Sequence, residues 1–236
     1  MTHIEQRSVL SQPLLLSVAE QLKLPLLQIA RLAEIGRLTN TADLQTIQTT
    51  ADSTLRLLDN YVLGISLAAE QYKLELEPVS VSAVLYDSGQ ELSALAENYG
   101  VDLELHIGGR FGTVMANKAG LQSALVSLAA ALIEALPALE QPQLKLQLAT
   151  HRCRYGIVAG VYTDTHQLTA EVLRHGRQLM GSSRQPLPEI THTASAGIFV
   201  ADSILKAMQL KLQVSRHNGL FGLGTILIPN NQMQLV

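Results

Sequence analysis

The feature that most constrains the fold is a long apolar stripe in the first third of the chain. Between about residues 43 and 70, apolar side chains recur at steps of three and four, at Leu44, Ile47, Ala51, Leu55, Leu58, Val62, Ile65 and Ala69. This is the period of one face of an α-helix, sustained over many turns. The stripe therefore predicts a long amphipathic helix whose apolar face packs against other helices.

A second helical pattern precedes this stripe, from about Ser11 to Gly36. Ser11 can cap the helix and Pro13 is tolerated in its first turn, whereas Pro25 lies inside the pattern and should kink it. Residues 37–42 predict a turn between the two helices. Two antiparallel helices cannot bury both sides of such apolar faces alone. The pattern therefore favours a homodimer in which two hairpins form a four-helix bundle.

Helical and strand patterns mix beyond Pro78 and Ser80, which mark a boundary. The chain predicts helices over residues 82–98, 119–136 and 196–208, and extended segments over 72–79, 101–107, 144–151, 154–162, 210–216 and 224–228. Residues 182–188 predict a mobile loop, and Gly222 and Gly224 are expected to serve a strand turn. The predicted fold class is α+β, with an antiparallel helical hairpin in residues 1–72 and a two-layer α/β sandwich with a mixed sheet in residues 73–236.

Composition excludes several classes of protein. The formal net charge is −3, so no broad basic surface for nucleic acid is expected. The one cysteine rules out an intrachain disulfide and a cysteine-based zinc site, and the pairs His166 with His175 and His151 with Cys153 lack further metal ligands at suitable spacing. Residues 121–139 are too amphipathic for a membrane span, and no signal peptide is evident. These features predict a cytoplasmic protein without a metal site.

Residues 18–29 read Val-Ala-Glu-Gln-Leu-Lys-Leu-Pro-Leu-Leu-Gln-Ile. This segment resembles the H-box of two-component sensor histidine kinases, which usually reads Ser-His-Glu-Leu-Arg-x-Pro-Leu-x-x-Ile. The phosphoacceptor histidine of that motif falls on Glu20, whose carboxylate cannot act as the imidazole nucleophile. Glu20 would either present a fixed negative charge to a partner or be an ordinary solvated residue. Lys23 would contact an acidic partner face or lie on the surface with its stem packed down.

The second domain resembles the ATP-binding domain shared by histidine kinases, gyrase-type ATPases and related chaperones. Residues 195–229 include Ser-Ala-Gly-Ile-Phe-Val-Ala-Asp-Ser-Ile-Leu and Gly-Leu-Gly-Thr-Ile-Leu-Ile-Pro, which are similar to the second glycine box, its helix and the closing strand of that family. Residues 114–125 are similar to the start of the N-box helix. The whole resemblance covers roughly residues 10–230.

The N-box of that family supplies an acidic or Gln residue and two Asn residues that help hold Mg²⁺ against the phosphates. The resemblance places these positions on Ser123, Ser127 and Ala131. An alanine methyl group offers no oxygen to a hard cation. The resemblance therefore implies that Mg²⁺ binding is lost.

The glycine boxes are also incomplete. The adenine-binding Asp of the first box falls on Thr163, or on Asp164 if the register shifts by one, and both of its glycines are absent. A backbone that approaches a nucleotide closely needs residues without Cβ. One glycine of the second box remains, Gly197. These residues outline a degenerate nucleotide pocket with no resident cofactor.

The resemblance implies a catalytically inactive histidine-kinase-like protein that acts in two-component signalling. Its partners would be a response-regulator receiver domain bound on the bundle, or an active histidine kinase in a mixed dimer. A fold can outlast its active site because packing needs only apolar patterning. The alternative is a sensor that binds ATP or ADP without Mg²⁺ through Asp164 and Gly197, or a kinase that phosphorylates a partner's histidine. A structural scaffold is a third possibility.

Overall fold

The computed structural model describes residues 12–39, 41, 43–69, 73–135, 144–165 and 189–230. The helices are α1 (Gln12–Thr39), α2 (Leu44–Ala68), α3 (Val81–Asn98), α4 (Lys118–Ala135) and α6 (Glu189–Ala207). The strands are β1 (Glu77–Val79), β2 (Val101–Ile107), β3 (Val114–Ala116), β4 (Leu144–Cys153), β5 (Gly156–Thr163), β6 (Leu212–His217) and β7 (Leu220–Leu227).

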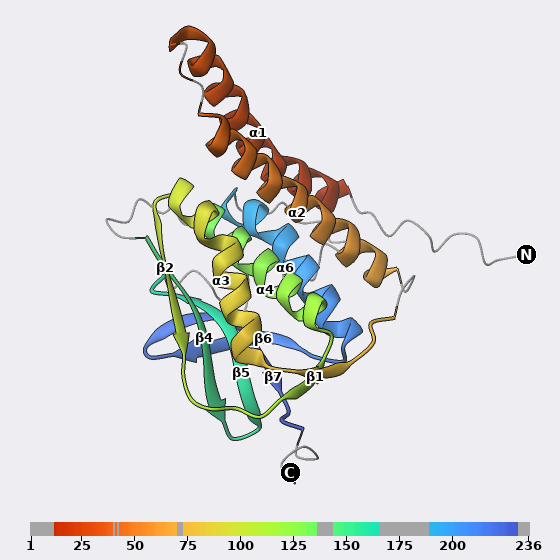
Figure 1. Ribbon diagram of the computed structural model, residues 1–236. Helices are drawn as coiled ribbons and strands as arrows, with labels where there is room; N and C mark the ends of the chain where they lie inside the picture. The colour runs from red at the N-terminus through yellow and green to blue at the C-terminus, as the bar shows by residue number, and fades with distance from the viewer. Residues whose placement is uncertain are drawn as a thin grey trace, which may run out of the picture.

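The N-terminal hairpin consists of α1 and α2, which run side by side and project from the rest of the molecule (Figure 1). Helix α1 continues to Thr39, so the predicted turn begins later than residue 37. Pro25 is buried within this helix. Asp43 caps α2, because its carboxylate accepts hydrogen bonds from the Thr46 backbone N–H at 3.0 Å and from the Thr46 hydroxyl at 2.6 Å.

A five-stranded mixed sheet follows, in the order β2-β4-β5-β7-β6. Strand β2 is parallel to β4, and the other neighbouring strands are antiparallel. Helices α3, α4 and α6 form a layer over one face of this sheet (Figure 1). Strands β1 and β3 form a separate antiparallel pair beside the layer. The predicted α+β class, with a helical hairpin and a two-layer sandwich, is confirmed.

Two local expectations were wrong, and one short strand was missed. Helix α6 begins at Glu189 rather than at residue 196, and β3 was not predicted because three residues are too few to show a period. Gly222 and Gly224 lie inside β7 rather than in a turn. The β6–β7 turn instead uses Asn218 and Gly219, which have φ angles of 48° and 83°. The expected mobile loop over residues 182–188 lies outside the described residues.

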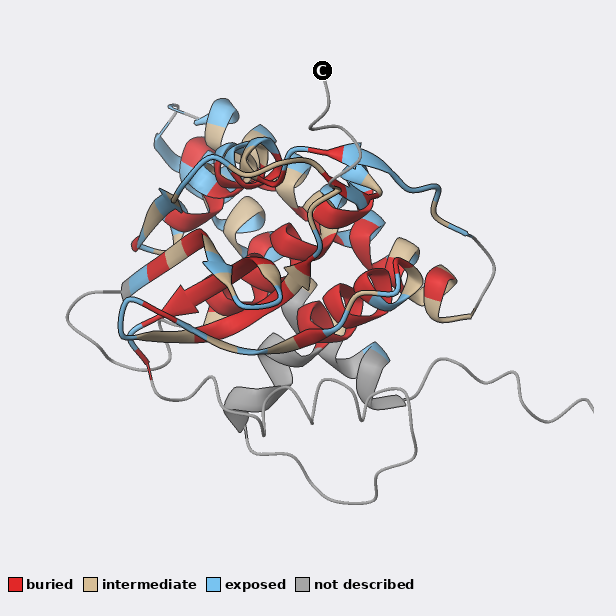
Figure 2. Ribbon diagram, turned by 90° about the horizontal axis from the view of Figure 1, so that it is seen from below, coloured by how far each residue is buried: buried red, intermediate tan, exposed pale blue. Residues whose placement is uncertain are grey.

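The hydrophobic core lies between the helical layer and the sheet, and extends to the inner face of α2 (Figure 2). Helix α4 is its centre, since nearly every residue from Gly120 to Glu134 is buried. Among the described helices, α4 alone is long and apolar enough to cross a membrane, but 67% of that window is buried inside the protein, as expected of a core helix.

Candidate functional site

The position equivalent to the phosphoacceptor lies in the first half of α1. Glu20 belongs to this helix, but its side chain is outside the described set. Lys23 is exposed one turn further along. The structure therefore places both residues on the helix that the H-box resemblance predicted, and their proposed role in partner binding stays a prediction.

Helix α2 has two distinct apolar faces. One face packs against α6 and its neighbours, and buries Thr50, Thr54, Leu57, Asn60, Tyr61, Gly64 and Leu67. The other face carries the stripe found in the sequence. Four residues of that stripe are exposed large hydrophobic residues, and we call them the α2 seam: Leu44, Leu55, Leu58 and Val62.

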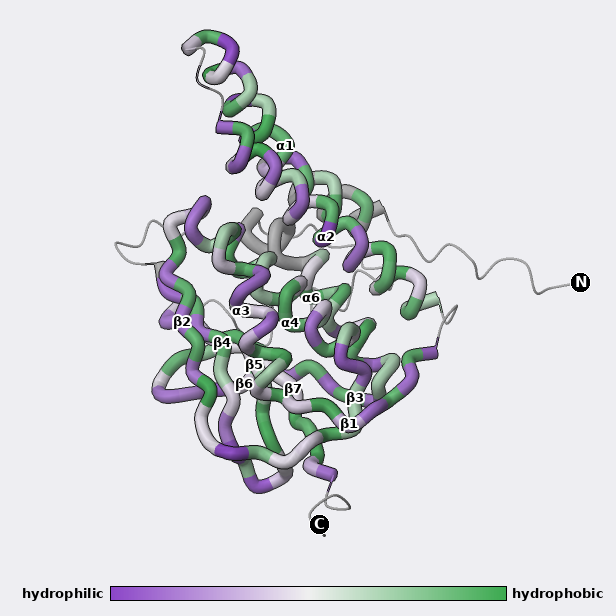
Figure 3. Tube along the Cα trace, viewed as in Figure 1, coloured by the Kyte–Doolittle hydropathy of each residue, from purple (hydrophilic) through white to green (hydrophobic). Residues whose placement is uncertain are grey.

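Helix α1 continues the exposed apolar surface. Leu26 and Leu27 are each 54% exposed, and Leu38 is 75% exposed. Hydrophobic and hydrophilic residues alternate along both helices of the hairpin (Figure 3). Exposed large apolar side chains on both helices mark a surface that another chain can cover.

The buried face of α2 tolerates threonines because their hydroxyls bond to their own helix. The Thr54 hydroxyl donates to the Thr50 carbonyl at 2.7 Å, and the Thr50 hydroxyl donates to the Thr46 carbonyl at 2.8 Å. Buried polar groups are costly only when they are left unpaired. Gly64 lets α2 approach α6 closely, because it sits directly over Val200.

Three residues of the predicted nucleotide pocket meet at the contact between α4 and α6. Gly197 faces Ser127 and Ala131 so closely that an added Cβ would lie 2.4 Å from the Ser127 carbonyl oxygen and 2.6 Å from the Ala131 Cβ. All three residues are buried. Gly197 therefore serves close helix packing in this structure, and the space between these residues is filled by protein atoms.

Ser123 and Ser127 differ in their surroundings. Ser123 is half-buried on α4. The Ser127 hydroxyl is buried and makes no hydrogen bond to any residue in the described part of the chain. The role of Ser123 and Ser127 in a nucleotide pocket stays a prediction.

The remaining pocket residues lie at the end of β5. Thr163 is buried, and its hydroxyl donates to the Asp164 carboxylate at 3.3 Å. Asp164 itself is exposed. The order of elements thus places an exposed carboxylate just after the strand that precedes the first glycine box in the resemblance.

A buried carboxyl group links the hairpin to the sandwich. Glu134, near the end of α4, is only 9% exposed. Burial raises the pKa of Tyr61, and the nearby Glu134 charge raises it further. Tyr99, at the end of α3, has a raised pKa for the same two reasons. In the sequence, Glu134 is a single charged residue within the amphipathic stretch 121–139.

The sheet also brings together a group of histidines that the sequence did not predict. His106, His151 and His217 come from β2, β4 and β6. His106 Nδ1 lies 2.6 Å from His217 Nε2, and the rings of His151 and His217 stack at 4.8 Å. No three metal-ligating side chains are arranged to hold an ion among the described residues, which leave out His166 and His175. No sequence spacing reveals this group, because its members are far apart along the chain.

Comparison with known proteins gives a match in structure and none in sequence. No protein-family model matches the chain. No curated protein matches it in sequence either.

Solved structures share the fold over almost the whole chain. The histidine kinase AdeS of Acinetobacter baumannii is similar with a TM-score of 0.52 and 14% identity, covering 89% of this chain and 97% of AdeS. A bacterial phosphotransferase has a TM-score of 0.54 and 9% identity, covering 95% of this chain and 98% of that one.

ShkA, solved at full length with AMPPNP, has a TM-score of 0.53 and 16% identity over 78% of this chain. The match spans 38% of ShkA. The helical hairpin, the α/β sandwich and the shared order of elements agree with the resemblance found in the sequence. The chain therefore has the fold of a histidine kinase core.

Proposed function

We propose that this protein is a catalytically inactive relative of histidine kinases that acts in two-component signalling by binding. Its hairpin would dimerise, and the resulting bundle would bind a response-regulator receiver domain or a partner histidine kinase. The proposal places the protein in the cytoplasm, where such domains act.

The contact between α4 and α6 is the observation that carries the proposal. In the resemblance, the α4 positions should hold Mg²⁺ and the α6 glycine should approach the nucleotide. Here Gly197 is instead packed on Ser127 and Ala131. Ala131 has no oxygen to offer a cation, and Ser127 has only its buried hydroxyl. Binding of Mg²⁺–ATP would require α6 to move away from α4.

The exposed α2 seam supports the homodimer. Leu55 and Val62 are more than half exposed at 58% and 57%, on the face opposite the sandwich. A second hairpin would bury this stripe in a four-helix bundle. In the resemblance, the H-box region of such a bundle is the docking surface for a receiver domain, and Glu20 and Lys23 belong to that region of α1.

Calorimetric titration of the full chain with ATP and ADP, with and without Mg²⁺, tests the inactive pocket. We expect no saturable binding at about millimolar nucleotide. This concentration would reveal a binding free energy of about −4 kcal/mol. Saturable binding that Asp164→Asn weakens and Lys23→Ala leaves unchanged would contradict the proposal. That result would favour the nucleotide sensor or the kinase that acts on another chain.

A gain-of-function variant tests the pocket a second way. Glu20→His restores an imidazole at the phosphoacceptor position. We expect no phosphohistidine after incubation with labelled ATP, because the ATP-binding half lacks its Mg²⁺ ligands. Appearance of phosphohistidine in this variant would show that the second domain is an active kinase.

A further inference from the structure

We propose that the curled end of the sheet, away from the α4–α6 contact, holds a binding site for the phosphate group of a small molecule. This inference is independent of the proposed function, since it concerns β2, β4 and β6 rather than the helical layer. The site would be a permanent feature of the sandwich.

The proposed site lies where side chains from the two outermost strands of the curled sheet meet. Strands β2 and β6 are the outermost strands, yet His106 and His217 are in contact at 2.6 Å, and the Asn218 amide lies 3.4 Å from His106. Glycines in the middle of the sheet permit this curvature. A Cβ at Gly222 would lie 2.7 Å from the Tyr162 ring and closer still to the Val161 carbonyl oxygen.

Tyr162 fixes the floor of the curled face. Its ring lies over Gly222 and is fully buried, and its hydroxyl bonds to the Ser215 hydroxyl at 3.1 Å. The centroid of the His217 ring lies 5.4 Å from that of Tyr162. The imidazoles are therefore held by packing as well as by their mutual hydrogen bond, so their positions do not depend on a ligand.

A hollow of about 380 Å³ opens beside the histidines. This volume is within the range of small-molecule sites, which run from roughly 300 to 1,000 Å³. The side chains that matter for binding are His106, His151, His217, Arg110, Arg152 and Phe111. Gly108 and Gly109 bring bare backbone to the rim, and Gly109 has a φ of 88°.

The lining selects an anion. It contains two arginines and three histidines, and none of its residues is acidic. His151 Nδ1 is buried and makes no hydrogen bond to any residue that the structure describes. Arginine and imidazolium donors bind phosphate oxygens with charge-assisted hydrogen bonds.

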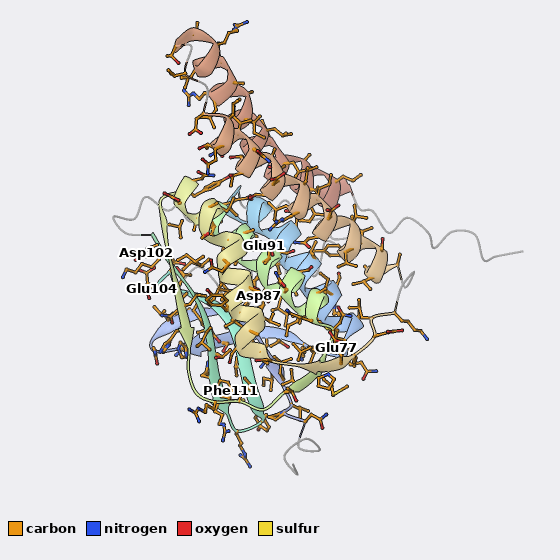
Figure 4. The ribbon with its side chains drawn as sticks, in the orientation of Figure 1. Glu77, Asp87, Glu91, Asp102, Glu104 and Phe111 are labelled. Atoms are coloured by element: carbon orange, nitrogen blue, oxygen red, sulfur yellow. The ribbon has the colours of Figure 1, made fainter. Side chains whose placement is uncertain are left out.

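The acidic groups of β2 lie elsewhere. Asp102 and Glu104 precede His106 on β2, and Glu104 lies two residues from it on the same face of the strand. Both acidic residues lie away from Phe111 (Figure 4). Lys145 partly neutralises them, at 3.8 Å from Asp102 and 3.3 Å from Glu104.

A second hollow of about 440 Å³ shares Phe111 and Arg152 with the first. Arg154 and Tyr155 also line it, and Tyr155 is 70% exposed. A phosphate monoester could place its phosphate group among the histidines and its organic part past Phe111. A free oxyanion would use the first hollow alone.

Binding should strengthen as the pH falls, because a bound phosphate group favours protonated imidazoles. The groups around His217 are His106 from β2, His151 from β4 and Tyr162 from β5, with Arg110 and Arg152 at the rim. None of these groups carries a negative charge near neutral pH. A bound anion would supply the missing counter-charge.

Calorimetry of the full chain with pyrophosphate and with phenyl phosphate tests the site, at about pH 6 and about pH 8 in about 0.15 M salt. We expect saturable binding of at least one probe at the lower pH, weakened roughly tenfold at the higher pH. The double variant Arg110→Ala with Arg152→Ala should weaken binding by at least roughly tenfold. Arg37→Ala removes one exposed charge from α1 and should leave binding unchanged.

Tyr155→Ala distinguishes the two sources of the phosphate group. Selective weakening of phenyl phosphate would assign a monoester, and no effect on either probe would assign a free oxyanion. In the unaltered protein, the ring resonances of His106, His151 and His217 should shift on adding pyrophosphate. Absence of saturable binding at about 10 mM and about pH 6, wild-type affinity in the double arginine variant, or binding of Zn²⁺ in place of both probes would overturn the proposal.

Discussion

The helical hairpin and the sandwich bury their apolar residues to very different extents. Leu121 and Leu128 on α4 are 0% and 1% exposed, whereas Leu55 and Val62 on α2 are more than half exposed. Both helices have apolar sequences, so composition does not explain the difference. The sandwich encloses its central helix completely, whereas the hairpin has only one of its two apolar faces covered.

Helix α6 connects the two regions. It packs against α4 through Gly197 and against α2 through Val200, which lies beneath Gly64. This arrangement leaves the outer face of α2 exposed while the sandwich is closed.

Leucines in the two regions should respond differently to truncation. Leu121→Ala should lower the free energy of unfolding by about 3–4 kcal/mol, because it leaves a cavity in a fully buried site. The matched change Leu55→Ala should cost less than about 0.5 kcal/mol in dilute protein, since this leucine is already exposed. Urea unfolding monitored by circular dichroism measures both, and similar losses would show that the seam is buried in solution.

The two interhelical glycines should also differ. Gly197→Ala should cost about 2–3 kcal/mol, because the new methyl group would lie against the rigid backbone of α4. Gly64→Ala meets Val200 at 3.0 Å, and the gain in helix propensity of about 1 kcal/mol should offset most of its cost. Thermal unfolding of the two variants provides the comparison. A stable Gly197→Ala protein would mean that α4 and α6 can separate.

Charges placed on the seam should weaken the dimer. Leu55→Glu combined with Val62→Glu should raise the dimer dissociation constant by at least tenfold, or about 1.4 kcal/mol, because the carboxylates would be buried in the bundle. Gln45→Glu adds a charge at an exposed position outside the seam and should have little effect. Light scattering at micromolar concentration gives the mass. A monomer in the unaltered protein would contradict the homodimer.

The smallest effect expected is on the pH dependence of stability. Burial lowers the pKa of His151 below its ordinary value of 6.5, and burial together with His151 and His106 lowers that of His217. The unfolded chain therefore binds more protons just below pH 6.5 than the folded protein does. The stability contributed by these neutral histidines should be fully present above pH 6.5 and be lost as the pH falls below that value. His217→Gln should reduce this slope in denaturant titrations, and an unchanged slope would show that other groups cause it.

Helices and strands with a clear period of their own were predicted from the sequence more accurately than features that lack one. The bounds of β2 agree with the predicted segment 101–107, and α3 begins one residue before its predicted start, because each carries its own period. The missed start of α6 lies in residues 189–195, where the pattern is polar and short side chains hide the helical period.

The candidate sites show the same division. Alignment with the H-box places Glu20 where the family has its histidine, and alignment with the N-box places Ala131 where the family has an asparagine. Both differences were therefore evident from the sequence. His106 and His217 lie 111 residues apart in the chain, and no spacing rule joins them. Their meeting depends on the curl of a five-stranded sheet, which the glycines of β5 and β7 permit.

The sequence alone determined the helical hairpin, the succession of elements in the sandwich and the residues absent from the kinase motifs, because these depend on local period and residue identity. The tertiary structure decided which face of α2 is buried, how closely Gly197 approaches α4 and which histidines come together. The physical reason is that an apolar or polar pattern specifies a surface, whereas its partner is selected by competition among all the surfaces that the rest of the chain presents.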